Sequence, residues 1–167
     1  MDLRVGNGYD VHALAEGETL WLGGIQIMHD KGTVAHSDGD VLIHALCDAM
    51  LGALAMGDIG QHFPDTDSRF KNIDSKILLQ QCNELIISKG YEIVNVDTII
   101  CAQRPRLKGH IPAMQKCLAS VLGVETNQVS VKATTTEKLG FVGREEGISS
   151  YATVLLIKNK DTVTILY

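Results

Sequence analysis

The stretch that decides the fold is LRVGNGYDVH, residues 3–12. Apolar and polar or small side chains alternate along it, which is the pattern of a β-strand with two unlike faces. One face carries Leu3, Val5, Tyr9 and Val11, and the other carries Arg4, Gly6, Gly8, Asp10 and His12. Residues two apart on a strand share a face, so Asp10 and His12 are expected to point the same way with Cα atoms about 6–7 Å apart. We expect the two glycines on that face to leave room for a concave site.

A histidine on an apolar helix completes a candidate metal site. The pattern of residues 40–55 predicts a helix, opened by the turn and capping residues SDGD at 37–40, and His44 lies within it. A carboxylate and two imidazoles from different elements leave a fourth coordination position open, which is typical of a catalytic rather than a structural Zn²⁺ site. We therefore predict that Asp10, His12 and His44 bind zinc. The alternative is that each side chain is an ordinary hydrogen-bonded residue.

Asp48 lies four residues after His44 on the same helix. Side chains at this spacing are neighbours, so its carboxylate is expected either to orient the imidazole or to form a plain surface ion pair.

The remaining pattern indicates alternating strands and helices. We predict a strand or hairpin over 19–27 that breaks at Gly23-Gly24, a loop over 57–67, helices over 75–89 and from Pro112 to Gly123, and strands over 91–103, 128–133 and 148–158. This order indicates an α/β (α+β) two-layer sandwich, with residues 1–167 as a single domain. Both faces of 148–158 are apolar, which indicates a subunit interface. Residues 159–167 form a C-terminal tail, in which 163–166 is expected to add an edge strand.

Two further segments carry charged and hydroxyl side chains. TTTEKLG at 134–140 fits a capping box, with Thr134 as N-cap and Glu137 reaching back. The same residues also suit a phosphate cradle at a helix N-terminus, or a Mg²⁺ site at Glu137. CAQRPRLK at 101–108 places three cations beside a proline bend.

Composition excludes several classes of function. A formal net charge of -5 argues against binding to nucleic acid or to an anionic membrane. No stretch approaches the roughly 18 apolar residues that a membrane span needs. The cysteines, which form no CxxC pair, are expected to be reduced and buried: Cys47, Cys82, Cys101 and Cys117. We expect a cytoplasmic protein, or one of the plastid stroma if the chain is a processed organellar protein.

Four motifs occur in order: GYDVH at 8–12, HSDGDV-x-x-HA at 36–45, GDIG-x-x-FPDTD at 57–67 and KATTTEKLGF-x-GR at 132–144. Over residues 3–158 the chain resembles the 2-C-methyl-D-erythritol 2,4-cyclodiphosphate synthase family. The resemblance implies a mixed β-sheet with helices packed on one face, and a homotrimer in which the sheets face each other. It implies a phosphorus-oxygen lyase of the non-mevalonate isoprenoid pathway. Such an enzyme cyclises 4-diphosphocytidyl-2-C-methyl-D-erythritol 2-phosphate and releases CMP, with active sites between subunits.

The resemblance also implies roles for individual residues. Asp10, His12 and His44 would hold Zn²⁺, Glu137 would help hold Mg²⁺ or Mn²⁺, and His36 and Thr135 would stabilise the transition state. The methylerythritol phosphate side would be bound by Asp10, His12, His36, Ser37, Asp58, Ile59, Gly60, Phe63, Pro64, Asp65, Thr66 and Asp67. The cytidine diphosphate side would be bound by Ala102, Gln103, Arg104, Pro105, Arg106, Leu107, Lys108, Thr134, Thr135, Thr136 and Glu137. Phe141 and Arg144 would line a cavity on the trimer axis that takes an isoprenoid diphosphate.

One departure from the family pattern concerns residues 106–108, which are Arg-Leu-Lys where relatives often have Lys-Met-Leu. We expect the side chains around the base to pack differently there. Two other functions compete with the synthase: a zinc-dependent phosphohydrolase with Asp48 or Asp58 as general base, and a non-catalytic isoprenoid diphosphate binder. The synthase needs no covalent protein nucleophile, because the 2-phosphate of the substrate attacks, and the sequence shows no Ser-His-Asp arrangement.

Overall fold

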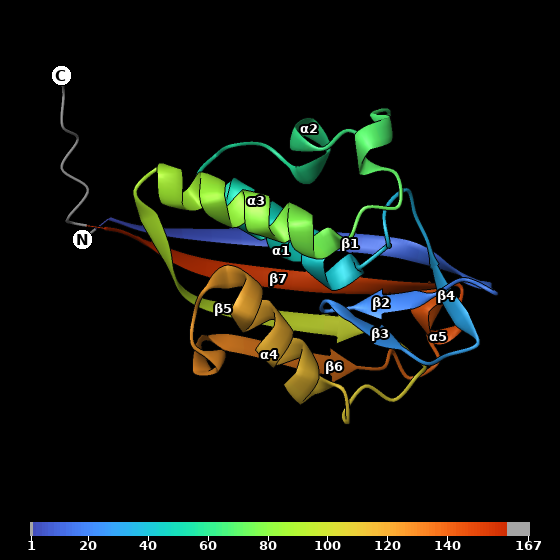
Figure 1. The fold of residues 1–167 in the computed structure, drawn as a ribbon. Coiled ribbons are helices and arrows are strands. Elements are labelled where there is room, and N and C mark those ends of the chain that lie inside the picture. The colour runs from blue at the N-terminus through green and yellow to red at the C-terminus, as the bar shows by residue number, and fades with distance from the viewer. Residues whose placement is uncertain (1, 160–167) are drawn as a thin grey trace, which may run out of the picture.

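The structure is a computed structural model that describes residues 2–159. Within that range, five strands form a mixed sheet in the order β4-β1-β7-β5-β6, and β2 and β3 form a separate hairpin (Figure 1). The strands are β1 (Leu3–Glu16), β2 (Leu20–Leu22), β3 (Ile25–Ile27), β4 (Lys31–Val34), β5 (Tyr91–Cys101), β6 (Val129–Thr134) and β7 (Gly147–Lys158). The helices are α1 (Val41–Ala53), α2 (Ile59–His62), α3 (Ser75–Ser88), α4 (Ile111–Leu122) and α5 (Gly140–Gly143), with 3-10 turns at Ser68–Phe70 and Thr126–Gln128.

The sheet is mixed because β5 and β6 run parallel whereas β1 pairs antiparallel with β4 and β7, and β5 with β7. Helices α1, α3 and α4 cover one face (Figure 1). The predicted two-layer sandwich, with helices on one face of a mixed sheet, is therefore confirmed. The predicted strands and long helices also form, but β4, α2 and α5 were not predicted.

Helix α1 is the buried centre of the domain, and it packs directly on β1. Gly6 and Gly8 face it, and a Cβ at either position would collide with a backbone carbonyl of the helix, that of Ala49 or Ala45. The expectation that these glycines leave room for a concave site is therefore wrong. The room is filled by the helix backbone, because without a Cβ the two elements approach within contact of their main chains.

Asp40 is the N-cap of α1, as predicted, and its side chain is fully buried. Its carboxylate accepts hydrogen bonds from the N–H groups of Ile43 (3.0 Å), Gly23 (3.0 Å) and Gly24 (2.7 Å). Burial raises the pKa of this carboxyl group, and the backbone donors offset part of that effect. One side chain therefore begins the central helix and fastens the Gly23-Gly24 turn of the β2–β3 hairpin to it.

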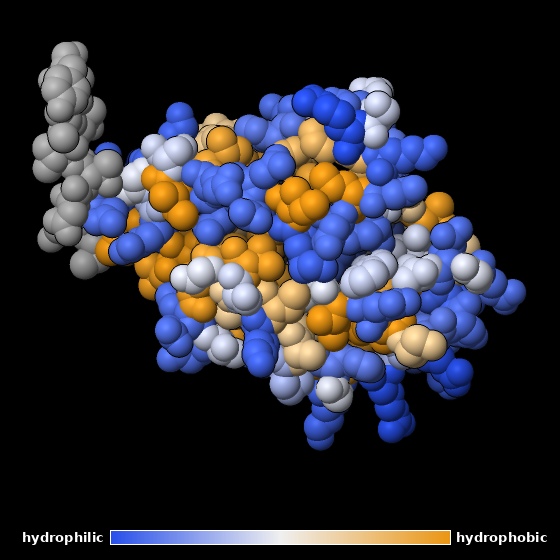
Figure 2. Space-filling model, viewed as in Figure 1, coloured by the Kyte–Doolittle hydropathy of each residue, from blue (hydrophilic) through white to orange (hydrophobic). Residues whose placement is uncertain are grey.

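The sheet face opposite the helices is open and apolar. Its side chains include Leu3, Val5, Tyr9, Val11 and Tyr151, and Val5 is 67% exposed. The rings of Tyr9 and Tyr151 lie 4.8 Å apart across β1 and β7. On the helix-covered side, apolar side chains are interspersed with polar ones (Figure 2). The open face fits the predicted subunit interface, which stays a prediction. The edge strand predicted at 163–166 lies outside the described residues.

The glycine contact predicts a large effect of one added methyl group. Gly8→Ala forces a Cβ against the Ala45 carbonyl, and we expect a loss of about 3 kcal/mol in the free energy of unfolding. Gly52→Ala is the matched control, because a Cβ at this exposed end of α1 meets nothing within 4 Å and a gain of up to about 1 kcal/mol is expected. Urea unfolding of both variants measures the difference, and equal midpoints would contradict the proposed close contact.

The buried cap predicts a second effect. Asp40→Ala leaves three buried backbone N–H groups without their acceptor, and we expect about 4 kcal/mol of destabilisation. Asp74→Ala removes the more exposed N-cap of α3, whose carboxylate accepts from the Lys76 N–H, and about 1 kcal/mol is expected. Thermal unfolding monitored by circular dichroism compares the two, and a larger loss for Asp74→Ala would contradict the role assigned to Asp40.

Candidate metal centre and active site

Three side chains predicted to bind metal converge at one point. Asp10 and His12 come from β1, and His44 comes from α1. The Nε2 atom of His12 lies 2.9 Å from Nδ1 of His44, and each nitrogen lies 3.1 Å from Oδ2 of Asp10. These residues form a cluster with metal-binding geometry among the described residues.

The donor set fits a zinc ion. When their groups are deprotonated, each of the three atoms presents a lone pair, so at 2.9–3.1 Å they need a proton or a cation between them. Ligands about 2.0–2.1 Å from a tetrahedral zinc ion lie about 3.3 Å from one another, so outward shifts of a few tenths of an ångström suffice. Two nitrogens and one oxygen leave a fourth position for a further ligand. The chemistry and spacing of the predicted triad therefore fit a metal ion with one coordination position left open.

The electrostatics of the triad also favour a cation. Burial raises the pKa of Asp10, but hydrogen bonds from His12 and His44 outweigh it and hold this pKa well below its usual range. For His44, burial lowers the pKa, but the hydrogen bond to Asp10 and the charges of Asp10, Asp40 and Asp38 together outweigh that effect and raise it. Both shifts come from the contact between the half-buried Asp10 carboxylate and the His44 imidazole, in which each charge stabilises the other.

The structure does not place Asp48 where it was expected. Its carboxylate accepts a hydrogen bond from the Ile59 N–H at 2.7 Å, and so it anchors the start of α2. Nε2 of His44 is instead within hydrogen-bond distance of two hydroxyl groups, those of Ser37 (3.1 Å) and Ser75 (3.0 Å). Sequence reasoning missed Ser75, because it lies 31 residues from His44 and has only the pattern of the first residue of a helix.

A cavity of about 240 Å³ opens beside the triad. Its lining is His12, Ala35, His36, Ser37, His44, Ile59, Phe63, Asp65, Phe70, Ile73 and Leu78. Five of the predicted substrate residues other than the metal ligands are therefore in its wall. The others near it are Asp58, Gly60, Pro64, Thr66 and Asp67, which do not line it. Asp58 is the N-cap of α2 and accepts from the Gln61 N–H, which shows that the 57–67 segment contains a short helix and is not all loop.

A second cavity, of about 330 Å³, lies where β5 and β6 end. Its lining is Ala102, Gln103, Pro105, Arg106, Leu107, Lys108, Ile111, Ala133, Thr134 and Thr135. Most of the predicted nucleotide-binding residues are therefore together. Arg104 is not in the lining and pairs with Glu145 at 3.7 Å, while the Gln103 side chain accepts a hydrogen bond from the Lys138 N–H. This last contact joins the 102–108 segment to the segment after β6.

The capping box expected at Thr134 is wrong. Strand β6 continues through Thr134, and Glu137 and Lys138 have left-handed backbone angles (φ 52° and 64°) that cannot belong to the first turn of a right-handed helix. The segment is a turn, in which the Thr135 hydroxyl donates to the Glu137 carboxylate at 3.2 Å. Glu137 is exposed, does not line the second cavity and is not part of the metal triad.

The two cavities lie at the same end of the sheet without sharing a residue. Asp10 is in register with Ser150 of β7, and Cys101 of β5 is in register with both Ser149 and Thr134. Three strand spacings of about 4.8 Å put Asp10 about 14 Å from Thr134. Phe141 and Arg144 line neither cavity, and Arg144 pairs with Glu146 at 2.9 Å.

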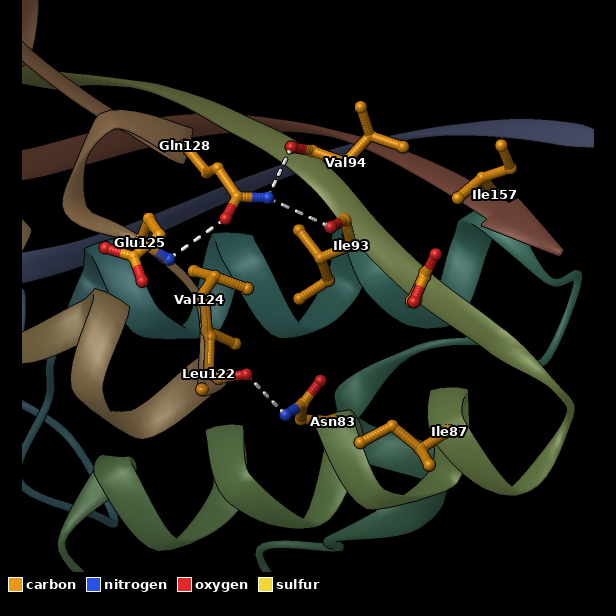
Figure 3. A pocket seen from close by; sticks show the side chains of 11 residues that line it. Asn83, Ile87, Ile93, Val94, Leu122, Val124, Glu125, Gln128 and Ile157 are labelled. Atoms are coloured by element: carbon orange, nitrogen blue, oxygen red, sulfur yellow. Dashed lines mark hydrogen bonds between the residues drawn. The ribbon is translucent and has the colours of Figure 1, made fainter. Parts of the chain in front are cut away.

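A third cavity, of about 520 Å³, lies away from the triad between α3, α4 and β5 (Figure 3). Its amide side chains already have partners in the protein: Gln128 donates to the carbonyl groups of Ile93 and Val94, and Asn83 donates to that of Leu122 (Figure 3). The contacts of these amides show that they brace the surrounding elements. No helix among the described residues is long and apolar enough to cross a membrane.

Comparison with known proteins agrees with this geometry. The model of the YgbB family matches residues 3–157. A Bacteroides fragilis protein named 2-C-methyl-D-erythritol 2,4-cyclodiphosphate synthase is 63% identical over 93% of this chain and 98% of its own length. The CDP complex of Plasmodium falciparum IspF has a TM-score of 0.83 at 38% identity over 95% of this chain and 97% of that one. The bifunctional IspDF of Campylobacter jejuni has a TM-score of 0.91 at 47% identity over 94% of this chain. The matched part makes up only 42% of IspDF.

These matches confirm the resemblance drawn from the four motifs, and they extend over nearly the whole described fold. The chain therefore belongs to the YgbB family.

Proposed function

We propose that this chain converts 4-diphosphocytidyl-2-C-methyl-D-erythritol 2-phosphate to 2-C-methyl-D-erythritol 2,4-cyclodiphosphate and CMP. The observation that carries the proposal is the convergence of Asp10, His12 and His44 within 2.9–3.1 Å beside a cavity, in a chain whose curated relatives bear the name of that synthase. The reaction would be a step of non-mevalonate isoprenoid synthesis, and the enzyme a phosphorus-oxygen lyase.

The reaction is an intramolecular displacement. An oxygen of the 2-phosphate forms a bond to the β-phosphorus, and the bond from that phosphorus to the oxygen bridging to CMP breaks, so the electron pair leaves with CMP. The protein's task is to fold a flexible anion into an in-line geometry, and positioning of this kind contributes several kcal/mol. Zinc held by the triad would supply a Lewis acid at the β-phosphate.

Each cavity would hold one half of the substrate. We assign the methylerythritol phosphate to the triad cavity, where His36 is an exposed side chain in the wall and can donate to phosphoryl oxygens. The cytidine diphosphate half is assigned to the cavity at the ends of β5 and β6, where Thr135 would donate to the transferring group. Glu137, whose carboxylate is exposed, would help to hold Mg²⁺ or Mn²⁺ against the diphosphate.

The walls of the triad cavity favour cyclisation over hydrolysis. Ile59, Phe63 and Phe70 line it, and the two phenyl rings pack edge to face at 5.5 Å, so much of the wall is apolar. A zinc phosphohydrolase would need a general base, for which Asp48 and Asp58 were the candidates. Both carboxylates accept backbone N–H groups at the start of α2, at 2.7 and 3.0 Å, and neither residue lines the cavity. We therefore favour the synthase.

The assembly would be a homotrimer held by the open sheet face. Leu3, Val5 and Val11 are exposed there, and covering such apolar area stabilises association. Neighbouring subunits would then bring one triad cavity against another subunit's nucleotide cavity. The axial cavity near Phe141 and Arg144 would take an isoprenoid diphosphate. The free state of all four cysteines fits a cytoplasmic location.

The proposed chemistry predicts strict dependence on metal. Incubation with the cytidyl substrate should yield CMP and a cyclic diphosphate, seen by phosphorus NMR, and a chelator should abolish both. Asp10→Ala removes one of three ligands, and a loss of at least about 100-fold in turnover is expected. Asp30→Ala, which changes an exposed carboxylate paired with His29, is the control and should keep full activity. Linear hydrolysis products, or turnover that survives the chelator, would rule out the mechanism.

The proposed assembly makes a separate prediction. Val5→Glu puts a charge into the open face, and we expect light scattering to show monomers where the unchanged chain gives trimers. Met28→Glu is the matched control, because this side chain is 88% exposed at the end of the β2–β3 hairpin, and its variant should stay trimeric. A trimer that persists with Val5→Glu would place the interface elsewhere.

A further inference from the structure

We propose that Ser75 and Asp38 are positioning residues that hold His44 as a metal ligand, through a chain of hydrogen bonds from the Asp38 carboxylate to the imidazole. Neither residue touches the cavity beside the triad. The inference rests on the zinc site of the proposed function, and it adds residues that would set the strength and geometry of that site.

The ring of His44 has a different environment on each nitrogen. Nδ1 faces the triad, 3.1 Å from Asp10 and 2.9 Å from His12. Nε2 faces away from it, 3.0 Å from the Ser75 hydroxyl and 3.1 Å from that of Ser37. Contacts at both nitrogens therefore hold the ring. Whether Nε2 carries the proton depends on whether these hydroxyl groups donate hydrogen bonds to it or accept them from it.

The Ser75 hydroxyl can only accept from His44. Its single proton is donated to Oδ1 of Asp38, because a carboxylate oxygen accepts and does not donate. Its oxygen is then left to accept the N–H of Nε2. A neutral imidazole that donates from Nε2 presents a lone pair at Nδ1, which is the atom aimed at the triad. The chain of bonds thus selects the form of His44 that a metal requires.

Asp38 is itself held rigidly. Oδ2 accepts from the Ser75 N–H at 2.9 Å, Oδ1 accepts from the Asp40 N–H at 3.2 Å, and the Asp38 N–H donates to the Ile73 carbonyl at 3.1 Å. Ser75 is fully buried. Groups with several hydrogen-bond partners keep their geometry, so this carboxylate fixes the hydroxyl, and the hydroxyl fixes the imidazole.

A purely structural role for Ser75 would be to cap α3, at whose first position it lies. The capping bond is already made by its neighbour, since the Asp74 carboxylate accepts from the Lys76 N–H at 2.9 Å. The Ser75 hydroxyl is turned instead toward Asp38 and His44. This division between adjacent residues supplies the matched control for an experiment.

The test measures metal affinity in the full chain. Zn²⁺ binding would be measured by competition with a chromophoric chelator, and Co²⁺ would be added as a second probe, since its visible spectrum reports ligand geometry. We expect Ser75→Ala to weaken Zn²⁺ binding by about 10- to 100-fold and to change the Co²⁺ spectrum. Asp38→Asn keeps the shape of the side chain and should weaken binding in the same direction. Asp74→Ala should leave affinity within about twofold and the spectrum unchanged.

The outcomes separate this inference from the proposed function. If the unchanged chain binds no Zn²⁺, both fail. If it binds Zn²⁺ and makes the cyclic product but Ser75→Ala and Asp38→Asn bind as tightly as it does, the positioning role alone is overturned. Equal weakening by Ser75→Ala and Asp74→Ala also overturns it, because helix stability would then be the cause. Should Ser75→Ala fail to fold, the affinity and Co²⁺ spectrum of Asp38→Asn decide.

Discussion

The contact on which the rest of the molecule depends is that between the backbones of β1 and α1. Gly6 and Gly8 lie against the carbonyl groups of Ala49 and Ala45, and no larger residue fits. The same two elements carry the metal ligands, because Asp10 and His12 follow the glycines on β1 and His44 precedes Ala45 on α1. Close approach therefore sets both the packing of the core and the 2.9–3.1 Å spacing of the triad.

Polar groups at the start of α1 complete this support. Asp40 is buried and fastens the β2–β3 hairpin to the helix, while Asp38 lies two residues earlier and bonds to the start of α3. Both carboxylates accept hydrogen bonds from several backbone N–H groups, which is how the fully buried carboxylate of Asp40 is tolerated. Three segments distant in sequence are thereby joined at the N-terminus of the helix that carries His44. The hydrogen bonds of Asp40 and Asp38 therefore both stabilise the fold and position the helix that carries His44.

The sequence was sufficient to predict what depends on local periodicity. The alternation of apolar and polar side chains identified the two faces of β1, and the apolar run identified α1. The polar residues Asp10, His12 and His44 within these two elements identified the triad. It failed where a side chain's partner lies far along the chain. The glycines were assigned to a cavity because nothing local shows that a helix packs on them, and Asp48 was paired with its helical neighbour although it binds Ile59. The capping box at Thr134 matched a local pattern that the extended end of β6 overrides. Ser75 carried no local signal at all.

The separation of the two cavities explains why an acidic chain can act on an anion. Arg106 and Lys108 lie in the lining of one cavity, and a metal ion held by the triad would lie at the other, about 14 Å across the sheet from Thr134, so positive charge would be divided between two places. Within one chain, no residue in the described range lines both cavities. The proposed substrate carries a 2-phosphate at one end and a diphosphate next to the cytidine, so sources of positive charge in both cavities would neutralise both groups. Stacking subunits through the open apolar face would bring them together, which ties turnover to a surface that touches neither cavity. On this view the apolar side chains of β1 serve the chemistry as much as its ligands do, from the opposite face of the same strand.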